Sequence, residues 1–397
     1  MLTSIRISDA EIAARGERLL AHIREQGLSG AVLFDNHYIL YYTGFAFIPT
    51  ERPIALILNA RGEKALFVPR LEVEHAKANA QLDRVEHYVE YPYQPHPAEI
   101  LLTTLKEMGI APPYGADQDG YPWILGYRGP SLSEQLGAPP RRITAFIEDQ
   151  MMIKSPAELN LIRESIKWGN LAHVLLQRYT RPGRSETEVS RRASTEATLA
   201  MLDAIGPIYQ AHSAFEDGPG AGYRGQIGRN AAIPHALANN ITFQAGDVLV
   251  TGASAPVWGY NSELERTMIV GPASDAQKRM FEHMLKLQET AFEHLRPGSP
   301  CSAVDRAVRD YYEAHDLMPC WKHHTGHAIG LRYHEGPFLD LGEQTLIQPG
   351  MVFTVEPGLY DPSLGGFRHS DTVVVTQDGI EILTYYPRDL ESLTIPL

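Results

Sequence analysis

The most informative stretch of this sequence reads Tyr-Asn-Ser-Glu-Leu-Glu-Arg-Thr and occupies residues 260–267. If this stretch is a β-strand, Glu263 and Glu265 point to one face, while Leu264 and Arg266 point to the other. Two carboxylates side by side repel each other, so we expect that face to hold a cation, a proton or a cationic substrate. The alternative is a charged strand edge that faces water.

The segments around this stretch are first helical and then mostly strand-like. Ser155 can cap a helix that begins at Pro156, and Glu158 completes a capping box. A glycine-rich stretch at 217–225 is interpreted as a mobile loop. We expect helices at 156–178, 186–204, from Ser274 to about 297 and at 302–315, and strands at 248–250, 263–270, 352–355 and 371–375. This order predicts a domain in which helices precede a sheet that carries polar residues.

The first part of the chain has a different pattern. Ser8 and Glu11 form a capping box, apolar residues then recur at helical spacing, and Gly27 can end the helix. Strand-like apolar runs follow at residues 31–34, 54–58 and 65–68. Strands that alternate with helical patterns predict an α/β domain up to about residue 145.

Bulk composition limits the class of protein. The chain has 397 residues, of which 44% are hydrophobic and 21% are charged, as in ordinary globular proteins with room for two domains. A net charge of -13 argues against nucleic acid or an anionic membrane surface as a partner. The two cysteines, Cys301 and Cys320, indicate no disulfide framework, and the chain shows no apolar run long enough for a membrane span. We therefore expect a cytoplasmic protein.

Further motifs accompany residues 260–267 in the second half of the chain. They are Pro234-His235, Thr325-Gly326-His327, His334, Val355-Glu356-Pro357-Gly358 and Arg368-His369-Ser370-Asp371. Together they resemble the pita-bread family, which contains proline-specific peptidases of the M24 type, methionine aminopeptidase and creatinase. The resemblance implies a creatinase-like N-terminal α/β domain at residues 1–150 and an α+β pita-bread catalytic domain at residues 151–397.

The peptidases of this family hold two metal ions with two Asp, one His and two Glu side chains. The matching positions here are Gly252, Glu263, His327, Glu356 and Ser370. Because Gly252 has no side chain and Ser370 has no carboxylate, a two-ion centre is not expected. Glu263, His327 and Glu356 could hold a single divalent ion. The expectation from this comparison is a protein that purifies without stoichiometric metal and uses no cofactor.

Creatinase, the metal-free member, resembles this chain in the Leu-Glu-Arg-Thr motif at residues 264–267 and in the positions of Glu356 and His235. This resemblance implies that Glu265 and Glu356 hold an amidine- or guanidine-like cation through charge-assisted hydrogen bonds. His235 would act as general base and acid, because a neutral imidazole can accept and return a proton near pH 7. Glu263 would add negative potential at the site, and His327 would support the pocket.

Substrate-binding roles are implied for Arg52, His334, Arg332 and Ser370. The segment around Arg52 resembles the part of creatinase that reaches the partner subunit's active site, so a homodimer with a shared site is expected. Arginine suits the binding of a substrate carboxylate because its planar guanidinium can donate two parallel hydrogen bonds. Creatinase has a histidine where this chain has Ser370, and the neighbouring His369 faces the opposite way on a strand.

The main hypothesis from the sequence is a metal-independent, creatinase-like hydrolase. It would cleave a non-peptide C–N bond of the amidine or guanidine type in a small molecule that carries a carboxylate. One alternative is an Xaa-Pro dipeptidase or aminopeptidase with an altered metal site. A second alternative is a catalytically inactive pseudo-peptidase that only binds a ligand.

Overall fold

A computed structural model describes residues 5–90, 95–122 and 129–397. The chain forms two compact units. The small unit contains Ile7–Gln150 and His212–Ala214, and the large unit contains Met1–Arg6, Met151–Ala211 and Phe215–Leu397. Within the described ranges, no helix combines the length and the apolar character that a bilayer crossing requires.

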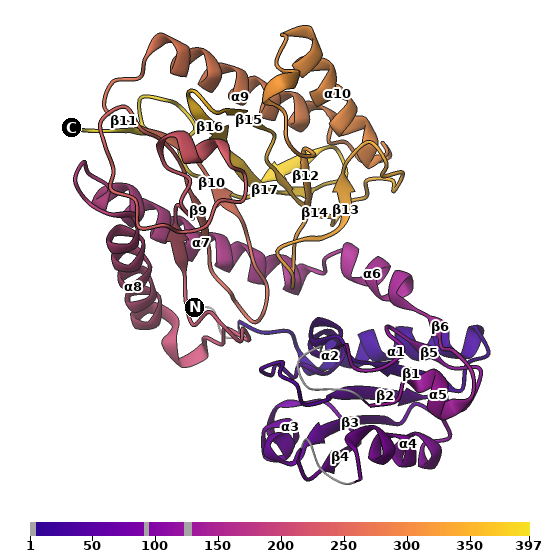
Figure 1. The fold of residues 1–397 in the computed structure, drawn as a ribbon. Helices are drawn as coiled ribbons and strands as arrows, with labels where there is room; N and C mark the ends of the chain where they lie inside the picture. Colours follow the sequence, from indigo (N-terminus) through magenta and orange to yellow (C-terminus); the bar gives the residue numbers. More distant parts are fainter. Residues whose placement is uncertain (1–4, 91–94, 123–128) are drawn as a thin grey trace. The chain divides into compact units, whose positions relative to one another are not determined.

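The small unit is built on a six-stranded sheet with the order β4-β3-β2-β1-β5-β6 (Figure 1). Its strands are β1 Gly30–Leu33, β2 Ala55–Asn59, β3 Lys64–Pro69, β4 Arg84–Tyr88, β5 Gly115–Ala116 and β6 Arg141–Arg142. Its helices are α1 Asp9–Glu25, α2 Asn36–Thr43, α3 Val73–Asn79, α4 Pro97–Glu107, α5 Leu132–Leu136 and most of α6 Thr144–Met152. The expected α/β architecture is confirmed.

Local capping explains where the long helices of the large unit begin. These helices are α7 Pro156–Tyr179, α8 Glu186–Ile205, α9 Asp275–His294 and α10 Cys301–Ala314. Ser155 accepts a hydrogen bond from the backbone of Glu158, and the Glu158 side chain accepts one from the Ser155 backbone. Ser274 and Gln277 form the same reciprocal pair at the start of α9. Each box satisfies N–H groups that a helix start otherwise leaves unbonded.

Figure 1 shows the sheets of the large unit beside these helices. An eight-stranded sheet has the order β13-β12-β14-β17-β10-β9-β7, with β18 paired to β17. Its strands are β7 Gly220–Gly222, β9 Gly252–Ser254, β10 Leu264–Glu265, β12 Gly326–Ala328, β13 Glu335–Leu339, β14 Val352–Val355, β17 Ser370–Val375 and β18 Ile380–Ile382. The remaining strands are β8 Val248–Val250, β11 Thr267–Val270 and β19 Thr394–Ile395 in one sheet, and the pair β15 Gly358–Asp361 and β16 Gly365–Arg368.

The expected strand at 263–270 is divided at Arg266. The part before it, β10, joins the large sheet, and the part after it, β11, joins the three-stranded sheet. The Arg266 side chain is fully buried, and its Nη2 donates to Asp371 Oδ1 at 2.7 Å. A buried guanidinium needs such partners, and the division between the two strands falls on the residue that carries this ion pair.

The glycine-rich stretch at 217–225 is not the mobile loop that the sequence suggested. Its centre forms β7, which pairs with β9 through Gly220–Gly222. A Cβ atom on Gly222 would lie 3.1 Å from Ser190 Oγ in α8. The missing side chain therefore lets this edge strand lie close against the helix.

Candidate metal centre

Three ligand-type side chains converge at the middle of the large sheet. Glu263 directly precedes β10, His327 lies in β12, and Glu356 directly follows β14. One ligand atom from each lies within 4.8 Å of the others. In the part of the chain that the structure describes, no other group of three His, Cys, Asp or Glu residues meets this condition.

The hydrogen bonds of His327 orient its ring for ligation. The ring is buried, and Nδ1 lies 3.0 Å from the carbonyl oxygen of Ala328, which fixes Nδ1 as the donor when the ring is neutral. Nε2 lies 3.1 Å from Glu356 Oε1 but makes no hydrogen bond of acceptable geometry. His334 stacks on the same ring at 3.9 Å between centroids.

The electrostatics of the cluster indicate a need for positive charge. Burial, followed by repulsion from Glu356 and Glu265, raises the pKa of Glu263 to about 7. Burial alone would lower the pKa of His327, but Glu356 and Glu263 outweigh it and raise that pKa. Burial alone would raise the pKa of Glu356, but His327 and Arg368 hold it below its ordinary value. Without a metal ion, a proton on His327 compensates part of the negative charge.

The donor set fits one divalent cation. Two carboxylates and an imidazole nitrogen without a well-formed hydrogen bond are the chemistry that such ions prefer. The set does not fit a second ion. Gly252 supplies no ligand, and the Ser370 hydroxyl donates a 2.6 Å hydrogen bond to Glu263 Oε1.

Glu265 is already paired with two internal arginines. Arg368 Nη2 donates to Glu265 Oε1 at 2.9 Å, and Arg368 Nε donates to Oε2. Arg224 Nη2 donates to the same Oε1 at 2.6 Å. Arg368 Nη1 also donates to the Tyr360 hydroxyl at 2.9 Å. The Glu265 carboxylate thus neutralises protein guanidinium groups, which removes the reason to assign it to a substrate cation.

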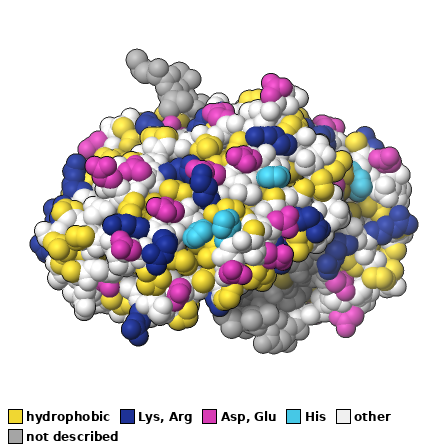
Figure 2. All heavy atoms as spheres, turned by 90° about the horizontal axis from the view of Figure 1, so that it is seen from above, with side chains coloured by type: hydrophobic (Ala, Val, Ile, Leu, Met, Phe, Trp, Pro, Cys, Tyr) yellow, Lys and Arg dark blue, Asp and Glu magenta, His cyan; other side chains and the backbone are white. Residues whose placement is uncertain are grey.

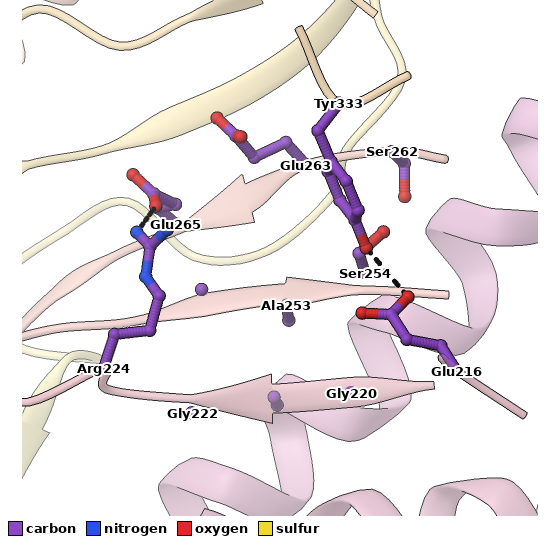
Figure 3. A pocket seen from close by; sticks show the side chains of 12 residues that line it. Glu216, Gly220, Gly222, Arg224, Ala253, Ser254, Ser262, Glu263, Glu265 and Tyr333 are labelled. Carbon is purple, nitrogen blue, oxygen red and sulfur yellow. Dashed lines mark hydrogen bonds and ion pairs between the residues drawn. The ribbon is translucent and has the colours of Figure 1, made fainter. Parts of the chain in front are cut away.

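A cavity of about 330 Å³ adjoins the centre. Figure 3 shows Glu263 and Glu265 on its wall, which confirms that they share one face of the chain. Arg224 lies at one side of the view, and at the other side the Tyr333 hydroxyl donates to Glu216 at 3.1 Å. The lining residues are Glu216, Gly220, Ala221, Gly222, Arg224, Gly252, Ala253, Ser254, Ser262, Glu263, Glu265 and Tyr333.

The other residues singled out in the sequence lie around the cluster or away from it. His235 is solvent-exposed, and its positive potential is one of the smaller causes that lower the pKa of His334, after burial and His327. The backbone N–H of Arg332 donates to Glu335 Oε1 at 3.0 Å. Arg52 belongs to the small unit, where it pairs with Glu51 at 2.6 Å and with Glu90 at 2.8 Å.

His369 points away from the cluster, as the strand alternation predicted, and packs edge-on against Phe281. Sequence reasoning missed Arg224, Arg368 and the Tyr360 hydroxyl. The signal for Arg368 was its place two residues before Ser370, in a motif that was already recognised. Nothing in the local sequence around Arg224 indicated a site.

Two family models match the chain. The model of metallopeptidase family M24 matches residues 160–377, which is more than half of the chain, and the creatinase/prolidase N-terminal domain matches residues 15–123. The chain belongs to metallopeptidase family M24. The expected combination of a creatinase/prolidase α/β domain with a pita-bread domain is thereby confirmed.

Relatives of this M24 protein match over nearly its full length. The probable dipeptidase PepE of Mycobacterium tuberculosis is 30% identical over 386 residues, which are 96% of this chain and 97% of that protein. The Xaa-Pro dipeptidase of Pyrococcus horikoshii is 28% identical over 379 residues, 94% of this chain and 97% of its own. The crystal structure of dipeptidase PepE from Mycobacterium ulcerans has a TM-score of 0.81 at 27% identity and covers 99% of this chain and 100% of its own.

These comparisons overturn the main hypothesis from the sequence. The similar proteins are named as dipeptidases and Xaa-Pro dipeptidases, so the creatinase-like, metal-independent cleavage of an amidine or guanidine is wrong. That hypothesis depended on Glu265 in the Leu-Glu-Arg-Thr motif. The structure explains Glu265 through its ion pairs with Arg224 and Arg368. The broader expectation of a hydrolase of the pita-bread family stands.

Proposed function

We propose that this protein is a metallopeptidase of the Xaa-Pro dipeptidase type that uses one divalent cation. The observation that carries the proposal is the convergence of Glu263, His327 and Glu356, whose ligand atoms lie within 4.8 Å of one another. The family and the full-length similarity to dipeptidases support a short peptide as the substrate.

Each residue of the centre has a role in this proposal. Glu263, His327 and Glu356 would hold the cation, which supplies Lewis-acid polarisation of the scissile carbonyl group. The Ala328 carbonyl oxygen orients the His327 ring, and the Ser370 hydroxyl orients one oxygen of Glu263. His334, exposed and stacked on His327, would contact the substrate beside the cation.

Two roles from the sequence remain part of the proposal. His235 is assigned proton transfer at the exposed rim, since a neutral imidazole can exchange protons with water there. Arg332 lies in the turn that also carries His334, and it is assigned to substrate binding. These assignments are independent of the creatinase-like substrate.

Hydrolysis assays on purified protein test the proposed function. We expect Xaa-Pro dipeptides to be cleaved in the presence of Mn²⁺, Co²⁺ or Zn²⁺, and a chelator to abolish cleavage reversibly. Loss of a residue that hydrogen-bonds a metal ligand typically lowers activity roughly 10–100-fold. His327→Ala removes a ligand itself, so it should reduce turnover by more than this. His294→Ala changes an exposed histidine on α9 and should have no effect.

A set of dipeptides that stays intact with each metal ion present would contradict the proposal. Binding of such peptides in calorimetry without any turnover would favour the inactive pseudo-peptidase instead. Cleavage that survives complete removal of metal would contradict the role of the cation.

A further inference from the structure

A cluster of arginines surrounds the connection between α7 and α8, although the chain as a whole is acidic. Five of the 35 basic residues lie within residues 178–192, whereas the formal net charge of the chain is -13. Of the two acidic residues in this stretch, Glu186 is buried, where it accepts hydrogen bonds from backbone N–H groups. The five arginines are all solvent-exposed, and they are Arg178, Arg181, Arg184, Arg191 and Arg192.

The turn between the two helices brings two of these arginines together. Residues 181–184 read Arg-Pro-Gly-Arg, and the N–H of Arg184 donates to the carbonyl oxygen of Arg181 at 3.1 Å. Gly183 has φ 83°, as the third position of a type II turn requires. Such a turn holds the Cα atoms of its first and last residues within about 7 Å. Arg178 lies three residues earlier, in the last turn of α7.

Helix stability explains only part of this arrangement. Arg178 and Arg181 lie at the C-terminal end of α7, where cations interact favourably with the helix dipole. Arg184 instead directly precedes the N-cap residue of α8, where the positive end of the dipole disfavours a cation. Its ion pair with Glu188, at 2.6 Å, joins two exposed side chains, and such pairs contribute little to stability. The position of Arg184 therefore indicates a role other than support of the helix.

Two cavities on this surface share Arg178 and Arg181 in their walls. The smaller cavity, of about 150 Å³, is lined by these two arginines together with Arg184 and Arg192, and by the carboxylate of Glu188. The larger cavity, of about 400 Å³, has apolar and aromatic walls that include Val174, Tyr386, Pro387, Ile395 and Pro396. Among the described residues, neither cavity shares a lining residue with the cavity beside the metal ligands.

The smaller cavity has an excess of positive charge. Within the ranges that the structure describes, Arg184 is the only one of its four arginines with a carboxylate at ion-pair distance. Arg192 lies over the Tyr179 ring, with Cζ 3.9 Å from the ring centroid, which leaves the N–H edge of its guanidinium for a ligand. A phosphate group carries about -1.5 to -2 charge at pH 7 and three acceptor oxygens, so it can accept hydrogen bonds from several guanidinium groups at once.

Hydrogen bonds between α7 and the C-terminal segment fix the wall of the larger cavity. The Tyr386 hydroxyl donates to Gln177 Oε1 at 2.6 Å, and Gln177 Nε2 donates to the carbonyl oxygen of Ser392 at 2.7 Å. The Tyr386 ring also packs edge-on against the buried His173, at 4.2 Å between centroids. A cavity with fixed apolar walls beside a group of cations fits a molecule that has an apolar body and an anionic end.

We propose that this surface binds a small organic phosphate, with the phosphate among the arginines of the smaller cavity and the body of the molecule in the larger cavity. Arg178 and Arg181, which line both cavities, bind the phosphate next to the body. This binding does not depend on the proposed peptidase activity.

Calorimetric titration with ADP, pyrophosphate and adenosine tests this inference. The whole protein is loaded with Mn²⁺ and then dialysed to remove excess ion. ADP and pyrophosphate share a diphosphate, whereas adenosine offers only the body. We expect ADP to bind more tightly than pyrophosphate or adenosine. Arg178→Gln should weaken the binding of ADP and pyrophosphate roughly 10–100-fold, as loss of a hydrogen bond between charged groups predicts.

Arg191→Gln is the matched control. It removes the same charge from the same surface, but Arg191 lines neither cavity. It should leave the dissociation constants of ADP and pyrophosphate nearly unchanged. If Arg191→Gln weakens binding as much as Arg178→Gln does, the arginines act as a diffuse positive field and the inference is wrong.

Three other results would overturn the inference. Equal affinity for ADP and pyrophosphate would exclude a ligand body in the larger cavity. ADP binding that is absent, or unchanged in Arg178→Gln, would exclude a phosphate site at the arginines. Binding to phosphatidylserine vesicles without any binding of ADP would make the surface a membrane contact instead. A failure to hydrolyse peptides would reject the proposed function and leave this site in place.

Discussion

At the residue scale, His173 shows how burial determines the charge of a single side chain. The ring is fully buried in α7, and its Nε2 lies 2.7 Å from Thr251 Oγ1. Burial, followed by the positive charge of Arg266, lowers the pKa of His173 to about 3. The folded protein therefore keeps this histidine neutral at pH values where an unfolded chain would protonate it.

This depressed pKa predicts a pH dependence of stability. The unfolded pKa is about 6.5, so between that value and about 3 the unfolded state binds one more proton at this position. The stability linked to the neutral, buried His173 is complete above pH 6.5. It is lost as pH falls, with a slope of about 1.4 kcal/mol per pH unit. His173→Gln should reduce the fall of the unfolding free energy between pH 6.5 and 4.5, measured by urea titration. Equal slopes for variant and wild type would contradict this.

The environment of Glu265 could be predicted only in part, because a local motif does not show ion-pair partners that are distant in the sequence. The sequence correctly predicted that Glu263 and Glu265 share one face, because strand alternation is a local property. The arginines that pair with Glu265 are 41 and 103 residues away, so no spacing rule could reveal that its charge is neutralised inside the protein. The substrate was predicted wrongly because the Glu265 carboxylate was assigned a role before its arginine partners were known.

At the element scale, a buried ion pair links the start of α7 to the turn that carries Arg332 and His334. Lys154 Nζ lies 2.8 Å from Glu335 Oε2, and both side chains are almost fully buried. Glu335 also accepts the backbone N–H of Arg332. Removing one partner leaves the other charge buried without compensation.

Lys154→Met should therefore cost about 3–5 kcal/mol of unfolding free energy, whereas the double variant Lys154→Met/Glu335→Leu should recover most of that loss. Chemical denaturation of both variants measures this. Arg163→Met breaks the exposed pair with Glu381 and should change stability little. If the double variant is as unstable as Lys154→Met, the cost comes from packing and not from an unpaired charge.

At the same scale, some elements of the fold could be predicted from the sequence and others could not. The starts of α7 and α9 were predictable, because each capping box lies within four consecutive residues. The division of the strand at Arg266 was not, since the partner that lets this arginine be buried, Asp371, is 105 residues away. The strand β7 was missed because its glycines resemble a loop until a helix packs against them.

At the scale of the whole molecule, the formal net charge is -13. The face in Figure 2 carries basic and acidic side chains side by side. The homodimer in which Arg52 completes the partner's site remains a proposal. We expect light scattering to give twice the chain mass of 44.2 kDa, and Arg52→Ala to weaken substrate binding. A fully active monomer would contradict the shared site.

The central claim is that this M24 protein works with one divalent cation. The metal content per chain, measured by plasma mass spectrometry after loading with Mn²⁺, Co²⁺ or Zn²⁺ and dialysis, tests it most directly. We predict one ion for wild type and for the exposed-residue control Glu293→Gln, and none for Glu356→Gln. Two ions per wild-type chain would contradict the exclusion based on Gly252 and Ser370, and no bound ion would contradict the three-residue centre itself.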